Sequence, residues 1–210
     1  MKHFIFLFSL ALSSILTCQQ DQESKLIVVR HGEGYHNLVK LHNSNPLHPN
    51  YFHADLTDLG RAQVAETAKK LLAQGFNKDN IDLVIVSPLP RTLQTAEILA
   101  EYGLFNEKYM VIDSRVIEVN AGDEEGQTVL TATGQKQDWY NWQTLNGETN
   151  KDIRDRMEDI YQAILKKSVK GNVLIVTHGL PSFELIRILT GEPIQLGTAE
   201  AKVLSLIKQS

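Results

Sequence analysis

Three runs of apolar, mostly β-branched residues constrain the fold of this chain more than any other feature. They cover residues 26–29 (LIVV), 83–86 (LVIV) and 173–176 (VLIV). Each run is too short for a helix and has the composition of a β-strand. Because no polar residue alternates within them, both faces of each strand have to be buried, which is typical of parallel sheets covered by helices. The runs therefore predict a parallel sheet at the centre of the molecule.

Helical patterns alternate with these strands, and shorter apolar runs predict a short strand at 110–112 and an edge strand at 203–207. The alternation predicts an α/β fold, a three-layer sandwich whose mostly parallel central sheet is covered by helices on both faces. No linker or repeat divides residues 25–210, which we expect to form one domain. The predicted helices cover residues 58–72 after the cap Thr57, 88–102 after the cap Ser87, 150–167 after the cap Thr149, and 182–190 before Gly191.

The overall charge gives no indication of a nucleic-acid partner. Of the 210 residues 42% are apolar and 22% are charged, and the formal net charge is −4. No cluster of basic residues stands out in the chain. Nucleic-acid binding normally requires such a cluster, so we expect no nucleic-acid partner.

The first 24 residues differ from the rest. A short positive start precedes an apolar stretch at 4–16, and no acidic residue occurs before Asp21. This pattern predicts a signal peptide over residues 1–18, followed by a polar tether at 19–24, and therefore an exported protein. Cys18 is the only cysteine, and its place resembles a lipoprotein processing site. Lipidation at Cys18, which would attach the protein to a membrane, and simple cleavage with release into the periplasm or medium both stay open.

Polar residues suited to phosphate follow each of the three main strands. Arg30 and His31 follow the first, Ser87 and then Arg91 the second, and Thr177 with His178 the third. If these strands are parallel and adjacent, their carboxyl ends bring two arginines and two histidines to one crevice. Guanidinium groups hold phosphate oxygens in a fork, and a neutral imidazole can attack phosphorus. An alkoxide leaving group also needs a proton, so a carboxylic acid should lie nearby.

The ordered motifs of the chain resemble those of the histidine phosphatase superfamily, in its phosphoglycerate-mutase-like branch. Each match alone is weak, but the set occurs in family order over most of the chain. The matching segments are Arg30-His31-Gly32-Glu33 with Asn37, Leu56-Thr57-Asp58-Leu59-Gly60, Ser87-Pro88-Leu89 with Arg91, Glu118 with Gly122 and Glu125-Gly126, Gly147-Glu148-Thr149, and Thr177-His178-Gly179.

The resemblance implies a role for each matched residue. His31 would be the nucleophile that becomes phosphorylated. Glu118 would act as general acid and then as base for water. The resemblance implies no metal and no organic cofactor, and a small phosphorylated molecule as the partner. The phosphoryl group would be bound by Arg30, Arg91 and His178, with Asn37 lining the same site.

Several residues allow a second interpretation. Glu124 or Glu125 are alternative acids to Glu118, and Arg30 could pair with Glu33 or another acid instead of phosphate. The roles of two further sets of side chains, four histidines and three aromatic residues, also stay open. The histidines at 36, 42, 48 and 53 fit no common metal pattern and favour a solvated loop over a metal site. The aromatic residues Trp139, Tyr140 and Trp142 either line a substrate site or pack in the core.

These observations predict an exported phosphatase that hydrolyses small phosphate monoesters through phospho-His31. Two alternatives stay open: a mutase that moves phosphate between positions of one substrate, and a non-catalytic phosphate-binding module. The substrate itself is not predicted, because the specificity contacts fall in the unmatched segments around 38–55 and 124–146. The oligomeric state is not predicted either.

Overall fold

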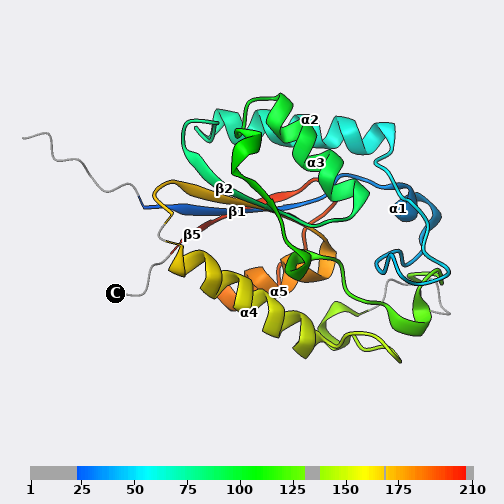
Figure 1. Cartoon of the computed structure of the whole chain (residues 1–210). Coiled ribbons are helices and arrows are strands. Elements are labelled where there is room, and N and C mark those ends of the chain that lie inside the picture. The colour runs from blue at the N-terminus through cyan, green and yellow to red at the C-terminus, as the bar shows by residue number, and fades with distance from the viewer. Residues whose placement is uncertain (1–22, 131–137, 168, 207–210) are drawn as a thin grey trace, which may run out of the picture.

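The computed structural model describes residues 23–130, 138–167 and 169–206. Within these residues a five-stranded sheet lies between two layers of helices (Figure 1). Helices α2 and α3 cover one face of the sheet, and α4 and α5 cover the other. The predicted three-layer α/β sandwich is therefore confirmed. The elements are β1 (Lys25–Arg30), α1 (Tyr35–Val39), α2 (Asp58–Ala73), β2 (Ile81–Val86), α3 (Pro90–Glu101), β3 (Met110–Ile112), α4 (Asn150–Lys166), β4 (Asn172–Thr177), α5 (Gly179–Thr190) and β5 (Ala201–Ser205).

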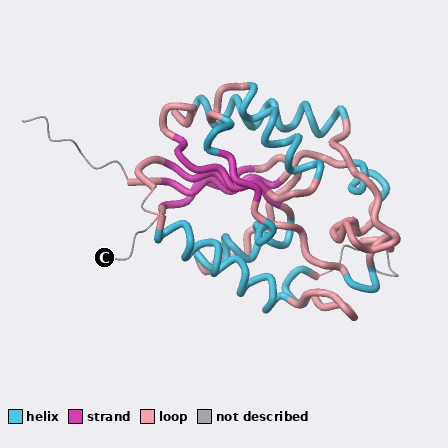
Figure 2. The backbone as a smooth tube through the Cα atoms, viewed as in Figure 1, coloured by secondary structure: helices cyan, strands magenta, loops and turns pink. Residues whose placement is uncertain are grey.

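The strands lie in the order β3-β2-β4-β1-β5. The first four are parallel to one another, and β5 pairs antiparallel with β1 at the edge. The three predicted apolar runs thus form the neighbouring strands β1, β4 and β2. Their carboxyl ends lie at the same edge of the sheet, where long loops gather (Figure 2). Ligand crevices of parallel α/β sheets lie at this edge.

The central runs of β1, β2 and β4 are apolar because each face of these strands packs against a helix layer. In β1, Leu26 and Val28 belong to the core cluster shared with α4 and α5. Ile27 and Val29 belong to the cluster shared with α2 and α3. All four side chains are fully buried. Because successive side chains of a strand point to opposite faces, they are divided between the two cores.

Two helix starts differ from the prediction. Helix α3 begins at Pro90 with Leu89 as its cap, and Ser87 lies outside it. The residue before a proline avoids the helical region, and Leu89 is accordingly extended, so the helix cannot begin before Pro90. Helix α5 begins at Gly179, three residues before the predicted start at Ser182.

The edge strand and one helix also differ. Strand β5 covers Ala201–Ser205, two residues before the predicted 203–207. The short helix α1 was not predicted, because its five residues carry no apolar periodicity. No helix in the described part of the chain is long and apolar enough to cross a membrane.

Candidate active site

The structure brings the polar ends of three strands together. The His31 amide donates to the Thr177 carbonyl at 3.0 Å, and the Ser87 amide donates to the Val176 carbonyl at 3.1 Å. The rings of His31 and His178 lie 5.1 Å apart between centroids. Arg91, in the first turn of α3, reaches the same point. All three side chains, His31, His178 and Arg91, are fully buried.

Two glycines allow the loop after β1 to lie directly on α2. A Cβ at Gly32 would come within 2.5 Å of the Gly60 carbonyl oxygen, and a Cβ at Gly60 would overlap the Glu33 carbonyl oxygen. Any larger residue at either position would push the loop away from the helix. The glycines therefore fix how closely the loop that carries His31 lies to α2.

The contacts of His31 select one tautomer of its ring. Nδ1 lies 2.7 Å from the Gly32 carbonyl oxygen, which only accepts hydrogen bonds, so Nδ1 carries the proton. Nε2 accepts a hydrogen bond from Arg91 Nε at 3.3 Å. Burial, followed by the charges of Arg91 and Arg30, lowers the pKa of His31 well below its usual value. The ring is therefore neutral at pH 7, with its lone pair on Nε2.

Arg91 is held by a residue from the unmatched segment 38–55. Its Nη2 donates to the Asn43 carbonyl at 2.8 Å, and its Nη1 donates to Asn43 Oδ1 at 3.3 Å. Burial lowers the pKa of Arg91 to about 10, so it keeps its charge at pH 7. Asn43 was not predicted, because no motif in the sequence connects it to Arg91.

Arg30 lies at the mouth of the same site. Its Nη1 donates to the Leu196 carbonyl at 2.8 Å, and its guanidinium lies 5.6 Å from the Trp139 ring centroid. Its Nε is buried without a hydrogen-bond partner. The alternative pairing with Glu33 is wrong, because Glu33 accepts a hydrogen bond from Thr57 instead. Burial lowers the pKa of Arg30.

Ser87 contacts His178 directly. Its Oγ lies 2.6 Å from His178 Nε2, and this hydrogen bond holds the ring. The other ring nitrogen, Nδ1, is buried without a hydrogen-bond partner. Burial and the charge of Arg91 lower the pKa of His178 well below its usual value, so this ring is neutral as well. Ser87 was predicted as a helix cap, and its place at the strand end gives it this different role.

The three candidate acids have different surroundings. Glu118 is half-buried and lines the cavity beside Arg30 and Arg91. Its oxygens accept hydrogen bonds from the amides of Val119 and Gly179. Among the described residues that line the cavity, Glu118 is the one carboxylate.

The two alternative acids lie elsewhere. Glu125 is fully buried and accepts three hydrogen bonds, two from Ser44 and one from Asn45. Glu124 lies 3.6 Å from His42 Nε2. Neither carboxylate lines the cavity. The geometry therefore favours Glu118 over both.

Asn37 and His36 extend from the short helix α1. Asn37 lines the cavity, and its Oδ1 accepts a hydrogen bond from the Gly34 amide at the helix start. His36 lies 5.4 Å from the His31 ring, is buried, and has its pKa lowered by burial and by the charge of Arg91.

The solvated-loop interpretation of the four histidines is wrong for two of them. His36 and His42 line the cavity, whereas His53 is exposed beside Asp55. No group of three His, Cys, Asp or Glu side chains in the described ranges is arranged to hold a metal ion.

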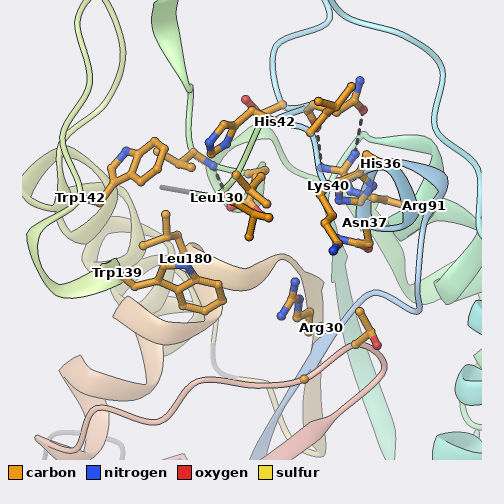
Figure 3. A pocket seen from close by; sticks show the side chains of 18 residues that line it. Arg30, His36, Asn37, Lys40, His42, Arg91, Leu130, Trp139, Trp142 and Leu180 are labelled. Carbon is orange, nitrogen blue, oxygen red and sulfur yellow. Dashed lines mark hydrogen bonds between the residues drawn. The ribbon is translucent and has the colours of Figure 1, made fainter. Parts of the chain in front are cut away.

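A cavity of about 620 Å³ opens beside Arg30, Arg91 and Glu118 (Figure 3). His31 and His178 are fully buried next to Arg91 and are not among the residues that line it. Two of the three predicted aromatic residues, Trp139 and Trp142, line it. Tyr140 does not, and packs with its ring 5.2 Å from Phe183. Cys18 lies outside the described residues.

The charges of the site fit an anion. Two guanidinium groups lie beside neutral imidazoles, and the buried Arg30 Nε and His178 Nδ1 have no hydrogen-bond partner in the described chain. In a buried site such charges act with little screening. A phosphoryl group would supply acceptors for these nitrogens, with His31 Nε2 directed at its phosphorus.

Comparison with known proteins agrees with this arrangement. "Phosphoserine phosphatase 1" of Hydrogenobacter thermophilus is 26% identical over 175 residues, covering 80% of this chain and 76% of the relative. "Probable phosphoglycerate mutase GpmB" of Yersinia pestis is 29% identical over 179 residues, with the same two shares.

Solved structures have the same fold. A protein from a Mycobacterium tuberculosis open reading frame superposes with a TM-score of 0.65 at 27% identity, covering 86% of this chain and 90% of the other. A mycobacterial glucosyl-3-phosphoglycerate phosphatase superposes with a TM-score of 0.70 at 23% identity, covering 87% and 92%. The sequence model of the histidine phosphatase superfamily (branch 1) matches residues 26–203. This chain, with its phosphatase- or mutase-like site, belongs to the histidine phosphatase superfamily.

Proposed function

We propose that this protein hydrolyses small phosphate monoesters through a phosphohistidine at His31. The observation that carries the proposal is the placement of His31, whose Nδ1 faces the Gly32 carbonyl and whose Nε2 faces Arg91 in a fully buried site. A protonated imidazole has no lone pair for phosphorus, so the lowered pKa makes His31 a nucleophile at pH 7.

The reaction has two steps. His31 Nε2 attacks phosphorus while the bond from phosphorus to the ester oxygen breaks, and Glu118 gives its proton to the leaving alkoxide. Water then attacks the phosphohistidine, Glu118 takes the proton of that water, and inorganic phosphate leaves with His31 restored. Arg91 donates to Nε2 in the free enzyme, so its guanidinium has to turn to the phosphoryl oxygens before attack. There it stabilises the charge of the transition state together with Arg30 and His178.

A mutase is the second candidate, because a curated relative bears that name. Both activities begin with the same phosphohistidine and differ in the acceptor, water or a substrate hydroxyl. Incubation with 3-phosphoglycerate and a trace of 2,3-bisphosphoglycerate separates them. Net release of inorganic phosphate supports the phosphatase, and formation of 2-phosphoglycerate without phosphate release supports the mutase.

The test of the nucleophile is His31→Ala. We expect kcat for 4-nitrophenyl phosphate to fall at least about 10³-fold, and acid-labile phosphate on the protein to disappear. The exposed His53→Ala is the matched control and should keep both. Wild-type turnover by His31→Ala would refute the proposed mechanism. Phosphate binding by the wild type without any turnover, and weaker binding by Arg91→Ala, would instead favour a binding module.

We also propose that the protein is exported, on the basis of the apolar stretch at 4–16 and its positive start. Mass spectrometry of the N-terminus of protein made in a bacterial host tests this. A chain beginning at a lipidated Cys18 supports export with membrane attachment. A chain beginning near residue 19 without lipid supports release, and an intact residue 1 with the protein in the cytoplasm contradicts export.

A further inference from the structure

The cavity is much larger than the phosphoryl group that it has to bind. Its volume of about 620 Å³ lies in the range of sites for whole small molecules, roughly 300–1,000 Å³. Arg30 and Arg91 lie at one end of it (Figure 3). The remaining space therefore belongs to the leaving group of the ester.

The wall beside Arg30 is apolar. Figure 3 shows Trp139, Trp142 and Leu180 gathered on one side of the cavity, with Lys40 and Asn37 on the other. Val119 also lines the cavity and is almost fully buried, as are Trp142 and Leu180. A polar leaving group placed against this wall would lose water without gaining hydrogen bonds there.

Trp139 is fixed in this wall by a buried anchor. Its carbonyl accepts a hydrogen bond from Asn150 Nδ2 at 2.7 Å, and the same nitrogen donates to Glu184 at 2.9 Å. Glu184 is fully buried and is paired with Arg154 at 3.2 Å and Arg187 at 3.0 Å. The backbone of Trp139 is thus held in place by a network that has no other evident task in the reaction.

The indole also adjoins the phosphate end of the site. It lies against the guanidinium of Arg30, 5.6 Å from ring centroid to guanidinium carbon. It also contacts the start of α5 closely, since a Cβ on Gly179 would come within 2.7 Å of its ring. A group attached to the ester oxygen beside Arg30 therefore meets Trp139 first.

From these contacts we propose that the substrate is a phosphate monoester whose leaving group carries a ring or a similarly large apolar body, which lies against Trp139, Trp142 and Leu180. The inference rests on the proposed phosphatase function and adds the class of leaving group to it. Polar substituents of that body would face Lys40 across the cavity. Phosphoserine, whose leaving group is small and bears two charges, fits this wall poorly.

The test compares 2-phenylethyl phosphate with ethyl phosphate. Both release a primary alkoxide, so a difference in kcat/KM reports the ring and not the chemistry of the leaving oxygen. We expect the wild type to favour the phenyl compound by about tenfold or more. Trp139→Ala should reduce that ratio to about threefold or less. The neighbouring Tyr140→Ala, which removes an aromatic ring outside the cavity, should keep it.

A binding experiment tests the same inference without turnover. The chain has two tryptophans and both line the cavity, so tryptophan fluorescence, excited selectively over that of tyrosine, reports this site. Titration of the wild type with 2-phenylethylphosphonate and ethylphosphonate should show a dissociation constant at least about tenfold lower for the phenyl compound.

The outcomes separate the two proposals. If the wild type hydrolyses the two esters with equal kcat/KM and binds the two phosphonates with equal affinity, the inference about the leaving group is overturned while the phosphatase stands. A higher affinity for the phenyl phosphonate, with no phosphate released from any ester, would support the apolar subsite and refute the phosphatase. If folded Trp139→Ala keeps the wild-type ratio of kcat/KM between the two esters, Trp139 is not part of the subsite.

Discussion

At the scale of single residues, burial decides the chemistry of this site. His31, His36 and His178 lie out of water, and this burial, followed by the charge of Arg91, lowers each pKa well below its usual value. A histidine in the same motif on a solvated loop would be partly protonated near pH 6.5 and a poorer nucleophile. The carbonyl of Gly32 completes the effect by holding the proton on Nδ1.

The two carboxylates Glu118 and Glu125 should differ sharply on substitution. Glu118→Gln removes the proton donor, so we expect kcat/KM for ethyl phosphate, which reports the first step and not the hydrolysis of the phosphohistidine, to fall about 10²-fold. The fall for 4-nitrophenyl phosphate should be less than about tenfold, because that leaving group needs no proton. Steady-state rates on the two esters check this. An equal loss on both would exclude Glu118 as the general acid.

Glu125→Gln is the matched control. It replaces a buried acceptor of three hydrogen bonds, so we expect the free energy of unfolding to fall by about 1–3 kcal/mol. Any change in rate should be the same factor for both esters. Urea denaturation and the same two assays measure this. A loss of rate on ethyl phosphate alone would identify Glu125 as the general acid.

At the scale of elements, the site depends on where helices begin. The helix α5 starts directly after His178, and its first amide, at Gly179, donates to Glu118. The indole of Trp139 lies so close to Gly179 that no side chain fits between them. The start of α5 thus connects the candidate acid, the second histidine and the aromatic wall.

Gly179→Ala should disturb Glu118, His178 and Trp139 together. Its Cβ would overlap the Trp139 ring, so we expect the free energy of unfolding to fall by about 1–3 kcal/mol and the affinity for phosphate to weaken. Gly197→Ala is the control for stability alone, because a Cβ there meets ordinary contact distances although the residue lines the cavity. Thermal denaturation with and without phosphate measures both effects. Adding Trp139→Phe should restore part of the stability, and an additive double mutant would show that the two residues do not interact.

At the scale of the whole molecule, the neutral histidines make stability depend on pH. The unfolded chain protonates His31, His36 and His178 below about pH 6.5, whereas the folded chain does so only at much lower pH. Unfolding therefore takes up protons as the pH falls below about 6.5, and the free energy of unfolding decreases. Each such histidine contributes up to about 1.4 kcal/mol per pH unit.

Urea denaturation between pH 7.5 and 5 measures this slope. We expect His31→Ala to reduce the slope, and the exposed His53→Ala to leave it unchanged. Phosphate should oppose the acid effect, because an anion in the site stabilises the folded state by its own binding free energy. A stability that is flat from pH 7 to 5 would contradict the neutral histidines.

Much of the fold and of the site could be predicted from local pattern. The apolar runs specify strands buried on both faces, and their polar ends specify where His31, Arg91 and His178 enter a crevice. These features depend on neighbours within a few positions, which the sequence displays directly. The family motifs then assign a role to Glu118, which no periodicity points to.

Only the tertiary structure decided the rest, because the remaining properties depend on distances between segments far apart in the chain. The strand order, the antiparallel direction of β5 and the Asn43 contacts of Arg91 arise from such packing. So does the apolar wall of Trp139 and Trp142, since the sequence left their site or core placement open. The sequence by itself determined that histidines and arginines stand at the ends of apolar strands. Strand order and burial, which exist only in the folded chain, determined that these residues meet and that the histidines are neutral.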